Sequence, residues 1–203
     1  MFRKALPGDL AQIAAIYDRI HTEEEAGRST VGWVRAIYPT EQTAADAIQA
    51  GDMFVAEEDG AIVAAAKINQ EQVPEYDQAA WTVDAPPEEV MVLHTLVVDP
   101  QAKGRGRGTQ FVAFYEDYAR SHGCRCLRMD TNEKNKNARA LYARLGYREA
   151  GIVPCSFNGI PGVNLVCLEK TLEDGLYIRT ARAEDLDAIA AVVLGGTSLA
   201  GGK

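Results

Sequence analysis

A glycine-rich turn in the middle of the chain carries the residues best suited to chemistry. Residues 97–109 read VVDPQAKGRGRGT, so an apolar strand ends and an amphipathic helix begins across alternating glycines. Glycines let a ligand approach backbone amides closely, and the free amides at a helix start attract anions. Three basic side chains add positive charge to the turn: Lys103, Arg105 and Arg107. The combination predicts a cradle for a di-anion or a diphosphate.

Two common phosphate-binding motifs do not match this turn. A Walker A loop needs Gly-Lys-Ser/Thr to reach phosphate and magnesium, and that triplet is absent here. A dinucleotide fingerprint places Gly-x-Gly-x-x-Gly early in a βαβ unit. Here the spacing is Gly104, Gly106 and Gly108, in mid-chain. Both motifs are therefore excluded.

Two motifs together resemble the GNAT superfamily of acyl-CoA-dependent N-acyltransferases. Gln101-x-x-Gly104-x-Gly106 is similar to the family's Gln/Arg-x-x-Gly-x-Gly/Ala pyrophosphate loop. The segment from Asn135 to Tyr147, Asn-x-x-Ala-x-x-x-Tyr-x-x-x-Gly-Tyr, resembles a second family motif that ends in Gly-Phe. The resemblance covers residues 2–172 in element order. It implies an acyltransferase of class EC 2.3.1, an N-acetyltransferase with acetyl-CoA as co-substrate.

The resemblance implies how the cofactor is held. The strand that ends at Val98 and the strand that begins at Cys124 would splay apart, and the pantetheine arm would lie between them as an added strand. Amides of the glycine-rich turn would hold the pyrophosphate, and Asn135 would hydrogen-bond the cofactor. The full implied cofactor-binding set is Leu96, Val97, Val98, Gln101, Lys103, Gly104, Arg105, Gly106, Arg107, Gly108, Thr109, Asn135 and Tyr142.

The resemblance also implies direct transfer within a ternary complex of enzyme, acetyl-CoA and amine. Tyr142 would point its hydroxyl at the thioester sulfur and act as general acid toward the CoA thiolate. A backbone N–H near Val97 would stabilise the oxyanion that forms when the neutral amine attacks. The alternative for Tyr142 is a side chain that anchors its helix to the core.

Several groups could take the proton from an ammonium substrate. His94 lies on the central strand, and an unperturbed imidazole pKa of about 6.5 suits base chemistry near neutrality. Strand alternation places His94 on one face with Val92 and Leu96, so a hydrogen-bonded core histidine is the alternative. Glu88 or Glu89, at the start of that strand, would act through a bound water. The sequence leaves these candidates open.

The cysteines predict core thiols rather than a metal site. Cys124 and Cys126, beside His122, lack a second pair of ligands at a spacing that suits a tetrahedral site. Alternation would send both thiols to one face of a strand. Cys155 and Cys167 also lie on expected strands. We expect no metal cofactor.

The acceptor pocket is expected opposite the cofactor. In the family it is shaped by the first two helices, the loop between them and a late hairpin. Here these features correspond to residues 23–33, Tyr38, Trp81 and residues 157–162. The expected acceptor is a primary amine of a small molecule or a peptide. The alternatives are a non-catalytic acyl-CoA-binding sensor module and an acetyltransferase acting on a protein N-terminus or lysine, which would need an open groove.

The elements that must position these residues alternate between helices and strands. Apolar spacing, caps and turn residues predict helices near 10–20, 40–50, 111–122 and 135–145, and strands at 2–5, 53–57, 61–68, 90–98, 124–131, 147–157 and 163–172. Residues 71–89 are polar and contain three prolines, which indicates a surface insertion. This order predicts a mixed α/β fold in three layers. The resemblance implies a mostly antiparallel central sheet with helices on both faces and one splayed parallel pair.

The chain divides into a domain of residues 1–172 and an extension of residues 173–203. Within the extension, residues 178–192 (IRTARAEDLDAIAAV) repeat residues 2–16 (FRKALPGDLAQIAAI). One interpretation is a degenerate terminal segment packed on the sheet. The other is an exchanged or edge-covering segment that supports a homodimer.

Composition bounds the class of protein. Of 203 residues, 47% are apolar and 25% charged, which excludes wholesale disorder and a fibrous architecture. The chain contains neither an apolar run long enough for a membrane span nor a signal-peptide core at its start. Four cysteines are no disulfide framework, which predicts reduced thiols in the cytoplasm. The net charge of −8 argues against a nucleic-acid partner.

Overall fold

A computed structural model describes residues 1–102 and 104–172, which form one compact unit. The strands are β1 (Phe2–Lys4), β2 (Met53–Glu58), β3 (Ala61–Asn69), β4 (Val90–Val98), β5 (Cys126–Asn132), β6 (Arg148–Phe157) and β7 (Ile160–Thr171). The α-helices are α1 (Leu10–Glu25), α2 (Glu41–Ala50), α3 (Arg107–Ser121) and α4 (Lys136–Arg144). The predicted extension, its internal repeat and Lys103 lie outside the described residues.

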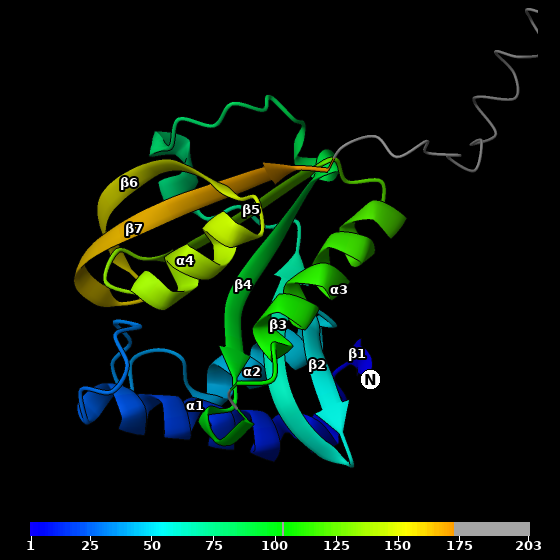
Figure 1. The fold of residues 1–203 in the computed structure, drawn as a ribbon, viewed down its shortest axis with the longest axis vertical. Coiled ribbons are helices and arrows are strands. Elements are labelled where there is room, and N and C mark those ends of the chain that lie inside the picture. Colours follow the sequence, from blue (N-terminus) through cyan, green and yellow to red (C-terminus); the bar gives the residue numbers. More distant parts are fainter. Residues whose placement is uncertain (103, 173–203) are drawn as a thin grey trace, which may run out of the picture. The chain divides into compact units, whose positions relative to one another are not determined.

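The strands form one sheet in the order β1-β2-β3-β4-β5-β7-β6. All neighbours are antiparallel except β4 and β5, which α3 connects as the crossover that a parallel pair requires. The parallel pairing runs from Val90–Cys126 to Leu93–Met129 and stops there. Beyond this point the two strands diverge (Figure 1). The expected mixed, mostly antiparallel sheet with one splayed parallel pair is confirmed.

Helices cover both faces of the sheet. On one face, α3 buries Phe111 and Tyr115 against the strands. On the other face, α1 and α2 pack on the β2–β4 half and bury side chains such as Ile13 and Ala44. In the described part of the chain, no helix combines the length and the apolar character that crossing a bilayer requires.

The segment between β3 and β4 is more than a surface insertion. It contains a short 3₁₀ helix, η2 (Pro74–Gln78), and Tyr76 within it is 2% exposed. Tyr76 packs with Val90, Val153 and Leu165 on the same sheet face as α1 and α2, over the part of that face that these two helices leave uncovered. The segment therefore completes the core over the β5–β7 half, which its polar composition did not indicate.

Several element ends differ from the sequence prediction for local reasons. Helix α1 continues through residues 23–25, beyond the helix predicted near 10–20. Strand β5 begins at Cys126, so Cys124 and Cys126 lie in different core clusters rather than on one strand face. Strand β7 begins at Ile160, because Asn158 and Gly159, both with positive φ, close a two-residue hairpin.

A β-bulge interrupts β4 at Thr95. Ala65 pairs with Val97 and Lys67 with His94, so β4 carries one residue more than β3 between these pairs. Thr95 has φ +53°, a strained conformation for a β-branched residue. The extra residue reverses the alternation, and Leu96 packs on the α3 face, opposite Val92. The predicted shared face of Val92, His94 and Leu96 is therefore wrong beyond the bulge.

Candidate active site

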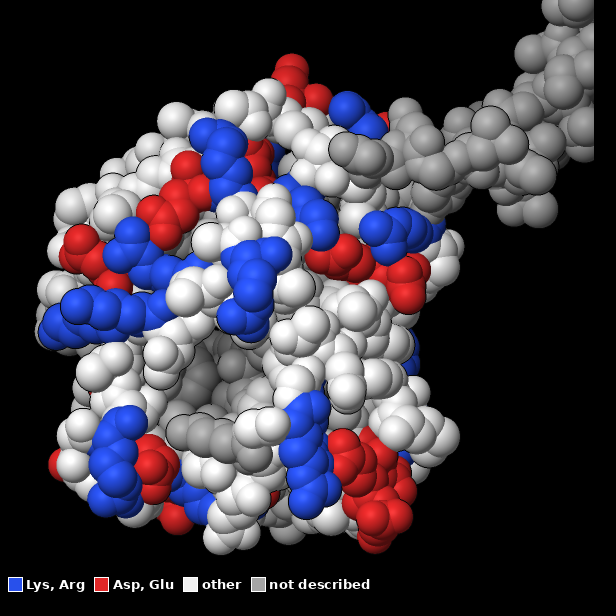
Figure 2. All heavy atoms as spheres, in the orientation of Figure 1, with Lys and Arg blue, Asp and Glu red and all other residues white. Residues whose placement is uncertain are grey.

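One cavity of about 1080 Å³ lies where β4 and β5 separate. Figure 2 shows it as a hollow in the face of the molecule. Residues from both faces of the sheet line this cavity, because the gap between β4 and β5 connects the two faces. On one side are Gly108 of α3 and Tyr142 of α4, and on the other are Tyr17 of α1 and Phe157 of β6.

The glycine-rich turn sits at one end of this cavity with donors exposed. Gly104 and Gly106 have φ of +88° and +68°, and apart from adjacent backbone no described atom lies within 4 Å of where a Cβ would stand on either. Gly106 caps α3 without a side-chain hydrogen bond. Among the described residues, none accepts a hydrogen bond from the amides of Gly108 and Thr109. The turn can therefore present these amides to an anion.

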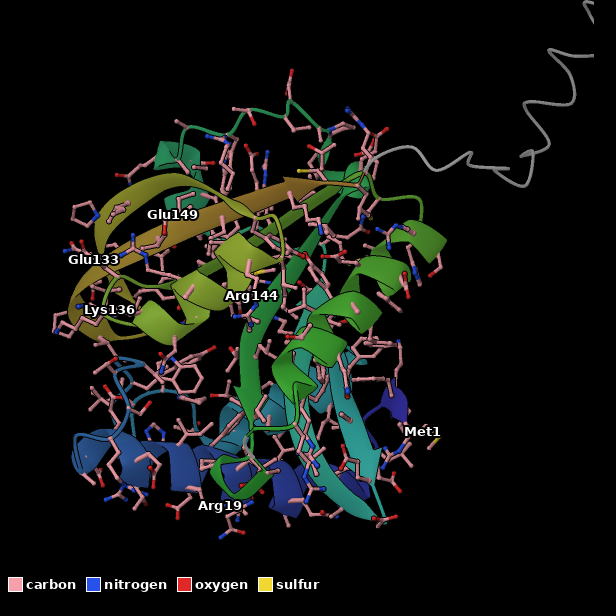
Figure 3. The ribbon with its side chains drawn as sticks, in the orientation of Figure 1. Met1, Arg19, Glu133, Lys136, Arg144 and Glu149 are labelled. Atoms are coloured by element: carbon pink, nitrogen blue, oxygen red, sulfur yellow. The ribbon has the colours of Figure 1, made fainter. Side chains whose placement is uncertain are left out.

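Asp99 fixes the turn to the body of the domain. Its carboxylate accepts two hydrogen bonds from Arg19 of α1, at 2.9 and 2.6 Å, and one from the Gln101 amide at 2.9 Å. Figure 3 shows Arg19 beside the turn that follows β4. Asp99 is only 8% exposed, so the carboxylate side of this bidentate pair is shielded from solvent, whereas the Arg19 side chain is partly exposed.

The basic residues of the glycine-rich turn differ in burial and in hydrogen-bond partners. Arg107 is buried, and its guanidinium bonds the Glu58 carboxylate and the Ala102 carbonyl. Its side chain is therefore not one of the free charges that the sequence predicted, although its amide belongs to the helix start. Arg105 is exposed. Figure 3 shows two further exposed cations on α4, Lys136 and Arg144.

The edge of β4 offers backbone groups to the gap. The Asp99 amide donates to the Val63 carbonyl at 2.9 Å, toward β3. Because successive amides in a strand point to opposite sides, the Val97 amide faces β3, and those of Leu96 and Val98 face the gap. The sequence placed the oxyanion donor near Val97. The neighbouring amides fit that role better.

Both residues of the second motif reach the cavity. Tyr142 is 6% exposed, and no described residue hydrogen-bonds its hydroxyl. Burial, with a further contribution from Asp130, raises the pKa of this hydroxyl above its ordinary value near 10. Asn135 caps α4 by accepting from the Ala138 amide at 3.1 Å, which leaves its side-chain NH₂ free at the cavity wall.

His94 also lines the cavity, but as a neutral side chain. The Asn69 side-chain nitrogen donates to Asp52 and Glu71, so its oxygen faces His94 and accepts from Nε2–H at 3.0 Å. Burial, followed by the charge of Lys67, lowers the pKa of His94 to about 4. This value makes His94 a weaker proton acceptor at neutral pH than an unperturbed imidazole.

The other candidate bases and ligands lie elsewhere. Glu88 and Glu89 precede β4 at the end where it pairs with β5, outside the cavity lining. Cys124 is buried near the Glu88 carbonyl. Among the described residues, no group of three or more His, Cys, Asp or Glu side chains could hold a metal ion.

The structure adds Asp130, which the sequence analysis missed. Asp130 of β5 lines the cavity, and its Oδ2 accepts from the Tyr76 hydroxyl at 2.8 Å. Burial raises the pKa of this carboxyl to about 6, although the Tyr76 hydrogen bond opposes the rise. A charged residue inside a strand beside the predicted gap was the available signal. Its partner lies in a segment without periodic pattern, so their contact was not predictable.

The loop between α1 and α2 covers the other end of the cavity. The Glu24 carboxylate accepts from the Val31 and Gly32 amides at 2.7 and 2.8 Å. The Tyr38 hydroxyl bonds the Thr95 hydroxyl at the bulge. Most of the expected acceptor region lines the cavity, including Glu23, Trp33, Tyr38 and Phe157. Trp81 does not, because its ring meets the Tyr76 ring edge to face and lies against the Arg128 guanidinium outside the cavity.

Comparison with known proteins agrees with this architecture. The chain is 37% identical over 60 residues to an uncharacterized N-acetyltransferase, YhfO of Bacillus subtilis, across 30% of this chain and 40% of that protein's length. It is similar to a GNAT-family acetyltransferase structure from Streptococcus agalactiae, with a TM-score of 0.72 and 25% identity over 85% of this chain and 95% of that one.

A second solved structure shares the fold. YncA of Salmonella typhimurium, determined with its cofactor acetyl-CoA, has a TM-score of 0.61 and 18% identity, covering 89% of this chain and 98% of that one. The model of the acetyltransferase (GNAT) family matches residues 13–147, from α1 through the glycine-rich turn to the end of the Tyr142 motif. With the split sheet and both motifs in place around one cavity, the chain belongs to the acetyltransferase (GNAT) family.

Proposed function

We propose that this protein transfers an acetyl group from acetyl-CoA to the amine of a small molecule. The observation that carries the proposal is the single cavity that joins the glycine-rich turn, through the gap between β4 and β5, to the Tyr142 hydroxyl and the aromatic side chains beyond. A thioester with a long arm and a diphosphate fits such a path. An amine would enter from the opposite side.

The residues present fit acetyl-CoA, which supplies an activated acetyl thioester when bound. The amides of Gly108 and Thr109 have no described acceptor, and the glycines before them leave room for a diphosphate. Arg105 adds positive charge at the same turn. The amides of Leu96 and Val98 can pair with the amide groups of the pantetheine arm as strand neighbours do. The acetyl-CoA held by YncA, which has the same fold, supports this assignment.

Tyr142 is suited to donate a proton. Its raised pKa keeps the hydroxyl protonated at neutral pH, and no described side chain competes for that proton. Negative charge develops on the CoA sulfur as the C–S bond breaks. A hydroxyl at the position of Tyr142 would protonate the sulfur at that moment. The gap-facing amides of β4 supply fixed donors for the developing oxyanion.

A small acceptor fits better than a protein side chain. The α1–α2 loop contacts both ends of the opening: Thr30 donates to the Lys134 carbonyl at 2.9 Å, and Ile37 lies against Gly159 at the β6–β7 hairpin. These contacts hold the loop over the acceptor side of the cavity. A protein N-terminus or lysine would have to displace them.

Calorimetry with acetyl-CoA and CoA release with a panel of small amines test the proposal together. We expect binding of acetyl-CoA and turnover with at least one small amine. Binding without turnover for any amine would instead identify a sensor module. Turnover restricted to proteins or peptides would show that the loop opens to a larger acceptor.

A further inference from the structure

Aromatic side chains and one carboxylate surround the acceptor side of the cavity. They are Tyr17, Trp33, Tyr38, Phe157 and Asp130, which we call the acceptor cup. The rings of Trp33 and Tyr38 meet edge to face with centroids 6.1 Å apart. Aromatic faces attract cations by their quadrupole, most strongly where water is excluded. The acceptor cup therefore combines aromatic faces with a carboxylate, and both attract a positively charged group.

Asp130 has no counter-ion among the described residues. Its Oδ2 is bonded to Tyr76, while no described residue hydrogen-bonds its Oδ1 and no described Lys or Arg pairs with it. A carboxylate in a desolvated site without a cation is costly, and an ammonium ligand would remove that cost. The titratable groups that face Asp130 are neutral or acidic: Glu75, Tyr76, Tyr38, Tyr142, Cys155 and Cys167.

A second buried polar group in the cup lacks a partner. Tyr17 is 2% exposed, and its hydroxyl has no hydrogen-bond partner among the described residues. Burial raises the pKa of this hydroxyl, so it stays protonated. Buried hydroxyls are nearly always hydrogen-bonded in native proteins. An ordered water or a polar group of the ligand would satisfy this hydroxyl.

The charges around the cavity disfavour an acidic acceptor. Among the described residues that line it, the carboxylates are Glu23, Asp46, Asp52, Glu71 and Asp130, and the only Lys or Arg is Lys67. Lys67 is already held by Glu71 at 2.7 Å. A carboxylate or phosphate on the acceptor would meet repulsion and find no free cation in this lining.

We propose that the acceptor is a small cationic amine without a carboxylate or phosphate, and that its ammonium binds Asp130 within the acceptor cup. The inference rests on the proposed function and narrows its acceptor class. The rings of Trp33 and Tyr38 pack against the alkyl or aryl body of the amine. The Asp130 carboxylate fixes the reacting nitrogen.

Asp130 is then also the first proton acceptor. An ammonium gives one proton to the carboxylate and becomes a neutral amine, whose lone pair forms the C–N bond. The C–S bond breaks, and the sulfur leaves with its electron pair and takes the proton of Tyr142. The nitrogen loses a second proton, which restores Tyr142, and Asp130 returns its proton to solvent. One ammonium ion and one thioester thus yield an amide, a thiol and one released proton.

Paired acceptors that differ by one carboxylate test the proposal. Tyramine and tyrosine, and cadaverine and lysine, are compared for binding to the CoA-loaded protein by calorimetry and for kcat/KM with acetyl-CoA. We expect at least tenfold tighter binding and higher kcat/KM for each amine than for its amino acid. Asp130→Asn should weaken amine binding at least tenfold and leave acetyl-CoA affinity unchanged. Asp77→Asn, an exposed residue next to Tyr76, is the matched control and should behave as wild type.

A pH profile separates proton acceptance from simple packing. In wild type, kcat/KM for an amine should rise with pH through about 6, and Asp130→Asn should lose this limb. Tyr76→Phe removes a hydrogen bond that lowers the Asp130 pKa, so it should move the limb to higher pH. Equal binding and turnover of amines and their amino acids, or a preference that survives Asp130→Asn, would overturn the inference while acetyl transfer itself stands. Failure to bind acetyl-CoA or to acetylate any amine would reject the proposed function as well.

Discussion

Replacing Gly106 with glutamate is the sharpest perturbation of the phosphate cradle. Gly106 caps α3 with φ +68°, and nothing lies within 4 Å of its Cβ position. Any side chain there costs about 1–2 kcal/mol for the left-handed backbone, without a steric clash. A carboxylate adds repulsion of about 2 kcal/mol for each phosphate charge at about 8 Å and an effective dielectric constant of about 20. That repulsion corresponds to at least about 30-fold weaker acetyl-CoA binding.

Two controls isolate the charge from the backbone strain. Gly106→Gln introduces the same size and strain without the charge. Gly60→Glu introduces a carboxylate at another glycine of positive φ, +79°, with equally open surroundings in the β2–β3 turn. Calorimetric titration at low ionic strength should show wild-type affinity for Gly60→Glu and an intermediate affinity for Gly106→Gln. Equal dissociation constants for Gly106→Glu and Gly106→Gln would refute the phosphate assignment.

Four further predictions follow from the same geometry. Tyr142→Phe should lower kcat about 100-fold or more with KM for acetyl-CoA within about twofold, because the hydroxyl bonds no described residue; a change in KM alone would make it a binding residue. Arg105→Ala should weaken acetyl-CoA binding in a salt-dependent way and leave Tm unchanged. Arg107→Ala should lower Tm, because only Arg107 is buried and paired with the Glu58 carboxylate. The reverse pattern would contradict this assignment. Asp99→Ala should cost about 1–3 kcal/mol of stability in denaturant titrations, since it removes the buried acceptor of the hydrogen bonds from Arg19 and the Gln101 amide; a loss below about 0.5 kcal/mol would argue against the anchor. Asp130→Asn should be more stable than wild type at pH 7.5, by up to roughly 3 kcal/mol, and equal to it near pH 4. The pKa of the Asp130 carboxyl is about 6 in the folded state, above its value in the unfolded chain, so ionising it at neutral pH destabilises the folded protein. Thermal melts at both pH values check the sign of this difference.

The elements around the glycine-rich turn were predictable because local signals mark them. Residues 90–98 form a strand with the expected ends, since the β-branched run stops at Asp99 and Pro100. Thr40 caps α2 and Gly51 ends it, as capping preferences indicate. Asn135 caps α4 by the same rule. In each case the residue types decide the backbone conformation within a few positions.

What was not predictable depends on tertiary contacts. The bulge at Thr95 occurs without a glycine, and the Tyr38 hydroxyl bonds the Thr95 hydroxyl from a loop more than 50 residues away. Arg107 looked like a free cation, but Glu58 across the β2–β3 hairpin neutralises it. The Tyr76–Asp130 contact joins an aperiodic segment to a strand interior. Local periodicity carries no information on such pairs.

A crystal structure with bound CoA tests the central claim most directly. The claim predicts diphosphate oxygens within hydrogen-bonding distance of the Gly108 and Thr109 amides, the pantetheine arm between β4 and β5, and the sulfur beside the Tyr142 hydroxyl. CoA bound at another surface, or a turn whose amides stay unoccupied while the nucleotide is ordered elsewhere, would contradict it.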